Sequence, residues 1–485
     1  MDSVSTTRTG HSSRTRNAPV RWDPNDPSYA TNCRRNAHAT VLQTNNELSG
    51  YHMAFVAGTR IEAPKGPYRD TLPPPPKSWK SMLKHPHFTG FRAAADKEYR
   101  ALLNKGTFEY AEITRLPKGQ QPLPLMWVFT YKFDSDGYLT KYKARLVARG
   151  DLQTTEEETY AATLAAQNFR ALMAIVAAFD LEVKQYDAVN AFANANLLTE
   201  IGAKCAEGYE EEGKILWVHK ALYGLKESPL LWYKHLTATL EELGFWSVPD
   251  TNCIFVSEKL ILIFYVDDIL VLYHSKDKHL VDEFELNLLK RYEVRVIGEA
   301  EHFLGVRILR DRENRKLWLL QDSYIDKIAE KFNITPSAYP VRTPLTTEEL
   351  VPYDDIATPE QIHYYQHTVG TLNYPATITR PDIAKSLSKL SEFLRNPSPK
   401  HQANAKRCVQ YLVNSKYLAL EYDGKLEQEQ IFFTYGDSAF ADDKNTCTSS
   451  HGFTVQLYGG TIDYKAIKGK TVTTSSTEAE LLAIS

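Results

Sequence analysis

The stretch Leu260-Ile-Leu-Ile-Phe-Tyr265-Val-Asp267-Asp268-Ile-Leu-Val-Leu-Tyr273 holds two short apolar runs separated by a pair of acids. Both runs are rich in β-branched and aromatic residues, which favour buried strands. Two adjacent carboxylates beside such runs are costly unless another charge compensates them, and a divalent cation does this well. A polar hairpin tip is the alternative, because aspartate is common in turns. The unbroken apolar run on each side is unusual for a surface tip and favours a cation site.

A third acid, Asp187, extends this candidate site. It ends the alternating stretch Leu181-Glu-Val-Lys-Gln-Tyr-Asp187, which predicts a strand. Taken alone, Asp187 is an ordinary acid at a strand end. Together with Asp267 and Asp268 it gives a carboxylate triad that could hold two cations. Such a pair supports in-line displacement at a phosphate, with a hydroxyl attacking and pyrophosphate leaving.

Size and composition exclude several classes of protein. The chain has 485 residues, of which 43% are hydrophobic, so about three domains of ~150 residues are expected. There is no secretory signal, and the run from Leu260 to Tyr273 is too short to span a bilayer. Five cysteines without a Cys-x-x-Cys pair favour neither a disulfide framework nor a structural zinc site. The net charge of −3 means that nucleic-acid binding would have to come from local patches.

The pattern along the chain changes at its N-terminal end. Residues 1–50 are polar and without periodicity, which predicts disorder, and Pro73-Pro-Pro-Pro76 predicts a stiff linker before order begins near Trp79. We expect helices at 88–104, 165–179, 229–243, 321–332 and 402–413, and strands at 126–133, 138–147, 181–187 and on both sides of Asp267-Asp268. A turn is expected at Asp134-Ser-Asp-Gly137, and a separate α/β piece at 431–485.

Seven short motifs occur in an order that resembles the polymerase region of copia-type LTR retrotransposon polyproteins, over roughly residues 80–345. The motifs are Tyr142-Lys-Ala-Arg-Leu-Val-Ala-Arg-Gly150, Asp187-Ala-Val-Asn-Ala-Phe192, Glu207-Gly-Tyr209, Tyr223-Gly-Leu-Lys-Glu-Ser-Pro229 with Trp232-Tyr233, Gly244-Phe245, Tyr265-Val-Asp-Asp268 and Phe303-Leu-Gly305. Each is weak alone, whereas seven in order are specific.

The resemblance implies an α+β fold, a right-hand polymerase of fingers, palm and thumb with an antiparallel palm sheet. The expected parts are a disordered segment and Pro-rich linker at 1–77, the reverse transcriptase at 78–345, a connection region at 346–430 and an incomplete ribonuclease H-like α/β piece at 431–485. Asp187, Asp267 and Asp268 match the family's catalytic acids, with Asp187 and Asp267 as the main metal ligands. Phe192 matches an aromatic steric gate that favours dNTPs over rNTPs; a core aromatic is the alternative.

The same resemblance gives expected contacts to the incoming nucleotide. Basic residues of the fingers-like hairpin would neutralise the triphosphate; the candidates are Lys132, Lys143, Arg145 and Arg149. Composition alone is also compatible with a solvated hairpin face. Tyr223 and Gly224 match the segment that approaches the nucleotide. The sequence departs from the family where Glu227 replaces a usual glutamine and where Asp151 follows Gly150.

Residues 431–485 resemble the start of the family's ribonuclease H domain. Tyr435-Gly-Asp437-Ser-Ala-Phe-Ala441 matches its first strand and Ser475-Ser-Thr-Glu-Ala-Glu480-Leu its first catalytic helix. Asp437 and Glu480 would be two of its metal-binding acids. The later acids of that domain do not occur in the chain, so we expect no ribonuclease H activity from it.

The implied function is RNA-directed DNA synthesis with two Mg²⁺ ions, or Mn²⁺. The implied partners are an RNA or DNA template, a DNA primer or RNA/DNA hybrid, and dNTPs, but no membrane. The implied location is intracellular, in a cytoplasmic virus-like particle and/or the nucleus. The alternative is an inactive relic of such an element that retains only nucleic-acid binding.

Overall fold

A computed structural model describes residues 65–134, 136–153, 159–161, 163–337, 339–425, 431–443 and 446–484. The described residues divide into two compact units: residues 65–73, 133, 134 and 136–140 belong to the first, and the other described residues belong to the second. In the first unit, Tyr68 forms a β-bridge with Tyr138, and Asp134 and Gly137 close the expected turn through a 3.2 Å hydrogen bond from the Gly137 N–H. The segment 1–50, expected to be disordered, lies outside the described residues.

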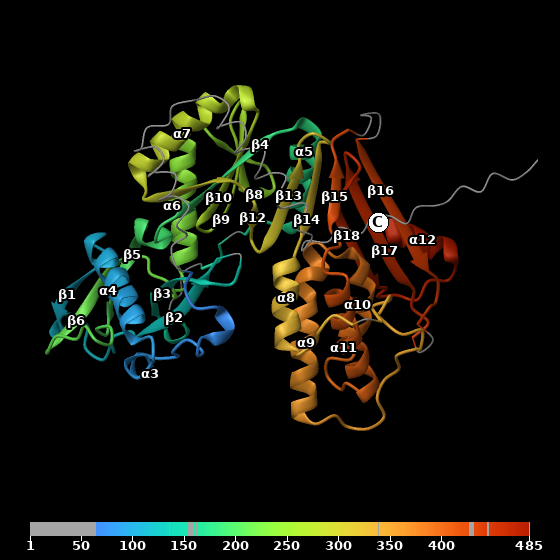
Figure 1. Ribbon diagram of the computed structural model, residues 1–485, viewed down its shortest axis with the longest axis horizontal. Helices are drawn as coiled ribbons and strands as arrows, with labels where there is room; N and C mark the ends of the chain where they lie inside the picture. The colour runs from blue at the N-terminus through green and yellow to red at the C-terminus, as the bar shows by residue number, and fades with distance from the viewer. Residues whose placement is uncertain are drawn as a thin grey trace, which may run out of the picture. The chain divides into compact units, whose positions relative to one another are not determined.

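A six-stranded antiparallel sheet forms the centre of the second unit. Its strand order is β11 (Val294–Glu299), β4 (Glu182–Ala188), β10 (Asp268–Tyr273), β9 (Leu260–Tyr265), β8 (Thr251–Val256) and β7 (Trp246–Val248). Figure 1 shows helices α6 (Ser228–Glu242) and α7 (Lys278–Arg291) on one side of this sheet and α5 (Ala166–Phe179) on the other.

Alternation along the strands explains why both faces are covered. Ile269 and Val271 of β10 belong to the core that includes α6 and α7, whereas Leu270 and Leu272 belong to the core that includes α5. Successive side chains of a strand point to opposite faces, so a strand between two helical layers must be apolar throughout. The unbroken run that follows Asp268 is therefore the consequence of a sheet buried on both faces.

The fingers-like region comes partly before the central sheet in the sequence and partly between its strands β4 and β7. It contains helices α3 (Trp79–Leu83) and α4 (Phe88–Asn104), the hairpin of β2 (Leu125–Phe133) and β3 (Leu139–Ala148), and a three-stranded sheet of β1 (Phe108–Glu112), β6 (Lys214–Lys220) and β5 (Asn196–Ala203). Helix α4 buries Phe91, Ala95, Tyr99 and Leu102, the stripe expected from the sequence. These residues share one core with α6, α7 and one face of the central sheet.

Four helices after the central sheet form a separate core. They are α8 (Asp322–Lys331), α9 (Pro359–Ile378), α10 (Ala384–Ser391) and α11 (Pro399–Asn414). A second sheet, of β12 (His302–Phe303), β13 (Val306–Asp311), β14 (Lys316–Leu320) and β15 (Leu420–Asp423), contributes to the core beneath α5.

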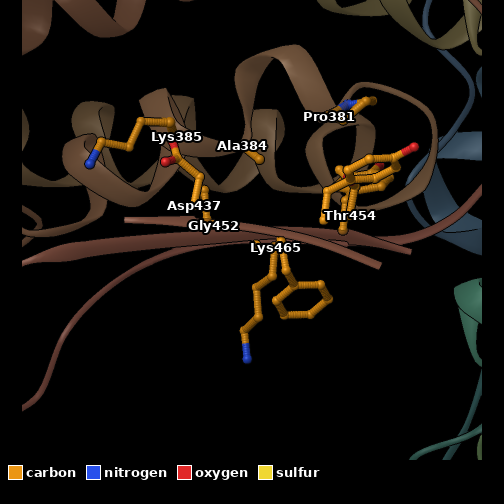
Figure 2. Close-up of a pocket in the computed structure, with 12 residues that line it drawn as sticks. Pro381, Ala384, Lys385, Asp437, Gly452, Thr454 and Lys465 are labelled. Carbon is orange, nitrogen blue, oxygen red and sulfur yellow. The ribbon is translucent and has the colours of Figure 1, made fainter. Parts of the chain in front are cut away.

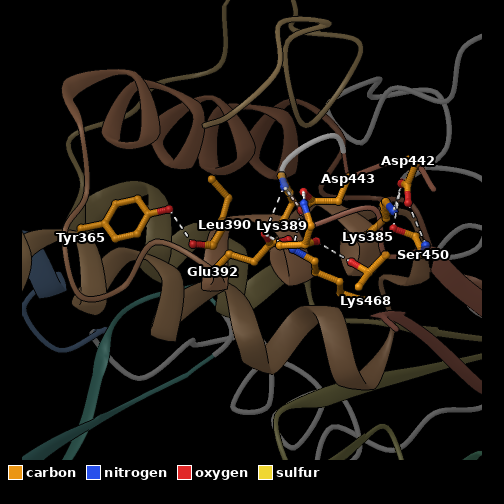
Figure 3. Close-up of polar contacts among 11 residues, drawn as sticks. Tyr365, Lys385, Lys389, Leu390, Glu392, Asp442, Asp443, Ser450 and Lys468 are labelled. Atoms are coloured by element: carbon orange, nitrogen blue, oxygen red, sulfur yellow. Dashed lines mark hydrogen bonds and ion pairs between the residues drawn. The ribbon is translucent and has the colours of Figure 1, made fainter. Parts of the chain in front are cut away.

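The C-terminal piece consists of the sheet β16 (Phe432–Ala439), β17 (Ser450–Leu457) and β18 (Gly460–Lys468) with helix α12 (Ser476–Ile484). Ion pairs attach it to α10 and the residue that follows that helix (Figure 3): Lys389 lies 3.0 Å from Glu392 and 3.4 Å from Asp443, and Lys468 pairs with both acids. Tyr464 of β18 packs into the core beneath α5. The α/β character expected for 431–485 is confirmed.

The expected elements are found with small shifts of their ends, and the α+β class with its antiparallel central sheet is confirmed. Two hydrophobic cores cross the expected boundaries at 345 and 430, because Ile325 and Ile334 pack with Leu412, and Phe169 packs in one core with Tyr464. These boundaries stay predictions. A turn of 3-10 helix at Arg69–Thr71 precedes Trp79, where order was expected to begin. Among the described residues, no helix combines the length and apolar character needed to cross a membrane.

Candidate functional site

A two-residue turn between β9 and β10 presents the paired aspartates. Tyr265 and Asp268 are opposite each other in the ladder, so Val266 and Asp267 form the turn. Val266 has φ of 56°, a left-handed conformation that strains a β-branched residue and is typical of functional turns. The buried Trp232 of α6 donates its indole N–H to the Val266 carbonyl at 2.7 Å, which holds this conformation.

Strand pairing brings the third acid to the same end of the sheet. Asp187 of β4 lies directly opposite Asp268 of β10, and the Ala188 N–H donates to the Asp267 carbonyl at 2.8 Å. The three predicted acids are therefore neighbours, although Asp187 and Asp267 are 80 positions apart in the sequence. All three side chains are half-buried.

Three negative charges on Asp187, Asp267 and Asp268 would repel one another at this end of the sheet. Burial, followed by the like charges of Asp267 and Asp187, raises the pKa of Asp268 to about 6, against the lowering effect of a hydrogen bond with Gln185. One oxygen of Asp187, Oδ2, is buried and has no hydrogen-bond partner among the described residues. The guanidinium of Arg295 lies 3.3 Å from that oxygen.

The donor chemistry of the triad fits divalent cations, although the side chains do not converge on one point. Among the described residues, no group of three or more His, Cys, Asp or Glu side chains is arranged to hold a metal ion as it stands. Asp187 Oδ2 accepts no hydrogen bond from the described residues, and the mutual repulsion of the acids raises the pKa of Asp268; an added cation would relieve both. Carboxylate oxygens are the ligands that Mg²⁺ prefers.

An aromatic pair lies beside the acids. Phe192 is buried in the short 3-10 helix Ala191–Asn194, and its ring meets Tyr223 edge-on at 4.7 Å between centroids. Burial raises the pKa of Tyr223 to about 12, and the charges of Asp267 and Asp187 contribute to that rise. Phe192 therefore contacts a tyrosine that is itself near the triad. This position is compatible with a steric gate and with a core aromatic, and the gate stays a prediction.

Arg145 extends this cluster toward the fingers-like hairpin. Its guanidinium lies over the Tyr223 ring, 4.6 Å from the centroid. Burial, and then the charges of the neighbouring Arg145 and Lys132, lower the pKa of Lys143. Three of the four predicted cations therefore gather on one part of the hairpin.

Arg149, the fourth predicted cation, is engaged elsewhere. It forms a two-pronged pair with Asp151, at 2.8 Å and 2.7 Å. Asp151 is the residue noted above as a departure from the family's pattern. The Lys226 ammonium donates to the Gln153 carbonyl at 2.7 Å, and Gln153 in turn donates to Glu227, the other departure, at 2.7 Å.

Two glycines allow the hairpin and the Tyr223 loop to meet backbone to backbone. A Cβ on Gly224 would lie 2.1 Å from the Ala148 carbonyl oxygen, and a Cβ on Gly150 would lie 2.0 Å from the Gly224 oxygen. The Ala148 N–H donates to the Tyr223 carbonyl at 2.7 Å. Gly224 also has φ of 92°, so its place in the motif has a steric cause.

The predicted acids of the C-terminal piece lie in different surroundings. Asp437 of β16 lines a cavity of about 240 Å³ between its sheet and α10. Figure 2 shows Asp437 and Lys385 on the same side of the sheet, with Lys465 on the other. Glu480 is half-buried on α12, which packs against β16 and β17. Their roles stay predictions.

Three residues of the site were not predicted from the sequence: Arg295, Gln185 and Trp232. Gln185 had a signal, since it lies two residues before Asp187 and so on the same face of a strand. Trp232 was quoted only as part of a motif. Arg295 had no local signal, because its position depends on the pairing of β11 with β4.

Comparisons with known proteins found similar sequences and one similar solved structure. Residues 108–347 match the model of the reverse transcriptase (RNA-dependent DNA polymerase) family. The chain is 34% identical to the retrovirus-related Pol polyprotein from transposon TNT 1-94 of Nicotiana tabacum over 84% of this chain and 31% of that protein. It is 32% identical to the Pol polyprotein from transposon RE1 of Arabidopsis thaliana over 74% of this chain and 25% of that protein.

A shorter relative and one solved structure complete the comparison. The putative transposon Ty5-1 protein of Saccharomyces cerevisiae is 29% identical over 62% of this chain and 98% of that protein. The solved foamy viral protease-reverse transcriptase in complex with an RNA/DNA hybrid has a TM-score of 0.41 and 16% identity, over 87% of this chain and 49% of that chain. The expected resemblance to copia-type polyproteins is confirmed, and the chain spans less than a third of the length of the plant polyproteins.

Proposed function

We propose that the chain adds dNTPs to a primer 3′-hydroxyl on an RNA template, because residues 108–347 match the model of the reverse transcriptase (RNA-dependent DNA polymerase) family. The observation that carries this proposal is the pairing of β4 with β10, which sets Asp187 opposite Asp268 beside the Asp267 turn. The proposed activity implies these substrates and partners: an RNA or DNA template, a primer or RNA/DNA hybrid, and dNTPs.

We assign the binding of divalent cations to Asp187 and Asp267, with Asp268 in support. Mg²⁺ or Mn²⁺ bound there would make the primer hydroxyl a better nucleophile and neutralise charge on the triphosphate. The raised pKa of Asp268 and the buried Asp187 oxygen, which accepts no hydrogen bond from the described residues, support this assignment. The protein's own part is to hold the acids in register, through strand pairing and the bond from Trp232 to Val266.

Nucleotide selection is assigned to the cluster beside the acids. Phe192, backed by Tyr223, would exclude a 2′-hydroxyl, and the cations of the hairpin would hold the triphosphate. An RNA/DNA hybrid is bound through its shape and backbone, so affinity should fall steeply with salt. A copia-type element would carry out this reaction in a cytoplasmic virus-like particle and/or the nucleus.

The test is primer extension on poly(rA)/oligo(dT) with Mg²⁺, together with a duplex-binding assay. We expect extension by the wild-type chain and none by Asp267→Asn, because that variant removes a ligand charge from a turn without changing its shape. Asp250→Asn is a matched control, since Asp250 also lies in a turn at the end of this sheet, with φ of 58°. Duplex binding without extension by the folded wild-type chain would favour the inactive relic.

A further inference from the structure

Arg295 occupies a position that the polymerase mechanism does not use. It lies in β11, directly opposite Asp187 of β4 in the strand ladder. Its Nη1 is 3.3 Å from Asp187 Oδ2, the buried oxygen that has no hydrogen-bond partner among the described residues. The charge of Arg295 therefore faces one oxygen of the acid to which we assign a metal ion.

The ion pair between Arg295 and Asp187 can separate without disturbing the core. The Arg295 side chain is 57% exposed and that of Asp187 is 24% exposed. An arginine at the rim of a sheet can turn into solvent on its flexible stem without exposing core. The next cation along β4, Lys184, is already 2.6 Å from Glu285 and so serves a different acid.

The acids around Asp187 favour a positive charge beside it. Asp187 and Asp267 are close enough to Asp268 for their charges to raise its pKa. A positive charge at Asp187 reduces this repulsion when no metal ion is bound. A divalent cation at the same oxygen would do so more strongly, so the guanidinium and the metal ion cannot both hold it.

We propose that Arg295 is a resident counterion that competes with the divalent cation for Asp187 and so sets the cation concentration at which the site is loaded. The inference rests on the proposed function, because it takes Asp187 as a metal ligand. Arg295 is a positioning residue in this scheme: it holds the Asp187 carboxylate in place until the cation displaces it.

The experiment measures Mn²⁺ binding by the full chain without primer, template or nucleotide, by electron paramagnetic resonance of free Mn²⁺. Removing the competitor in Arg295→Gln should tighten Mn²⁺ binding about 2- to 5-fold, the range for one partly exposed ion pair. Arg295→Lys, which keeps the charge, should bind close to the wild type. The difference should shrink at high salt, because exposed charges are screened.

Three further variants make the outcome of the Mn²⁺ experiment decisive. Arg291→Gln removes a similarly exposed arginine whose partner is Glu242, and it should leave Mn²⁺ affinity unchanged. Arg295→Met, which keeps the aliphatic stem, replaces Arg295→Gln if the latter does not fold. Equal or weaker Mn²⁺ binding by folded Arg295→Gln or Arg295→Met, with binding lost in Asp187→Asn, would overturn the counterion and leave the polymerase proposal standing. Unchanged Mn²⁺ binding in Asp187→Asn would overturn the metal assignment itself.

Discussion

At the scale of single residues, the contact between Phe192 and Tyr223 would support Phe192 in its proposed role as a steric gate. The two rings meet edge-on at 4.7 Å, and Phe192 is buried. Phe192→Val should shorten the side chain without exposing charge, so a 2′-hydroxyl would be accepted. We expect the ratio of rNTP to dNTP incorporation, measured as kcat/KM, to rise about 10- to 100-fold.

A matched variant separates selectivity from packing. Phe169→Val removes a buried ring from α5 that lies 5.3 Å from the Phe303 ring, between centroids, in the other core. It should lower stability while leaving sugar discrimination as in the wild type. Unaltered discrimination in Phe192→Val would instead make Phe192 a core aromatic.

Arg145 and Arg149 should differ in their effect on nucleotide binding, although one motif contains both. Arg145 lies over Tyr223 next to the acids, whereas Arg149 is held by both oxygens of Asp151. We expect Arg145→Gln to raise the KM for dTTP about 10-fold, as for loss of a charge-assisted phosphate contact. Arg149→Gln should change that KM by less than about 2-fold. Steady-state kinetics on poly(rA)/oligo(dT) measures both, and a larger effect at Arg149 would reverse the assignment.

At the scale of elements, the junction between the hairpin and the Tyr223 loop depends on Gly224. A Cβ there would clash with the Ala148 oxygen at 2.1 Å, and φ is 92°. Gly224→Ala should therefore destabilise the chain by about 2–4 kcal/mol and displace Tyr223. Gly244→Ala is the control, because φ there is 83° but nothing lies within 4 Å of the added Cβ, so only about 1 kcal/mol of backbone strain is expected. Urea unfolding measures the two variants, and equal midpoints would contradict the steric argument.

Helix α11 begins with a cap that should make its stability depend on pH. The Ser398 N–H donates to His401 Nδ1 at 2.9 Å, and the His401 N–H donates to Ser398 Oγ at 3.1 Å. Burial lowers the pKa of His401, and the charges of Lys389 and Lys400 lower it further, against a raising contribution from the Val351 backbone. Protonation would remove the acceptor at Nδ1 and break the cap.

The sign of the effect follows from that lowered pKa. The unfolded chain binds the proton more tightly, at a pKa of about 6.5. The contribution of the cap is therefore complete above that pH and is lost as pH falls toward the folded-state pKa. His401→Gln keeps a capping-box residue that does not titrate, so the fall in unfolding midpoint below pH ~6.5 should be smaller in this variant. An identical pH profile for both proteins would show that His401 is not the titrating group.

Local pattern predicted the elements whose periodicity is regular, and the stripe of α4 is a clear case. It did not predict α9, where Pro375 lies inside the helix, or α10, which has only 8 residues. For the site, the acids could be found because motifs and alternation are local properties of the sequence. Arg295 could not be found, because the pairing of β11 with β4 joins residues that are far apart in the chain.

At the scale of the whole second unit, Arg170 connects three parts of the chain. It lies in α5 and is 2% exposed. Its guanidinium donates to the carbonyls of Ile462 at 2.6 Å, Thr377 at 2.7 Å and Ile378 at 3.0 Å. It also lies over the Tyr464 ring, 4.8 Å from the centroid. Helix α5, the end of α9 and strand β18 are therefore joined by one buried charge.

Arg170→Met should loosen all three parts together. The variant keeps the apolar volume but leaves three carbonyls without their donor, and an unsatisfied buried polar group costs about 1–3 kcal/mol. Hydrogen exchange should increase in β18 and at the end of α9, because these segments lose a shared partner. Helix α4, which belongs to another core, should keep its protection. Arg407 is the control, because among the contacts described its guanidinium bonds only to Thr343 on the surface. Arg407→Met should leave the hydrogen-exchange protection of every segment as in the wild type. Protection changed in α5 alone would mean that the C-terminal piece is held by the Lys389–Asp443 ion pairs rather than by Arg170.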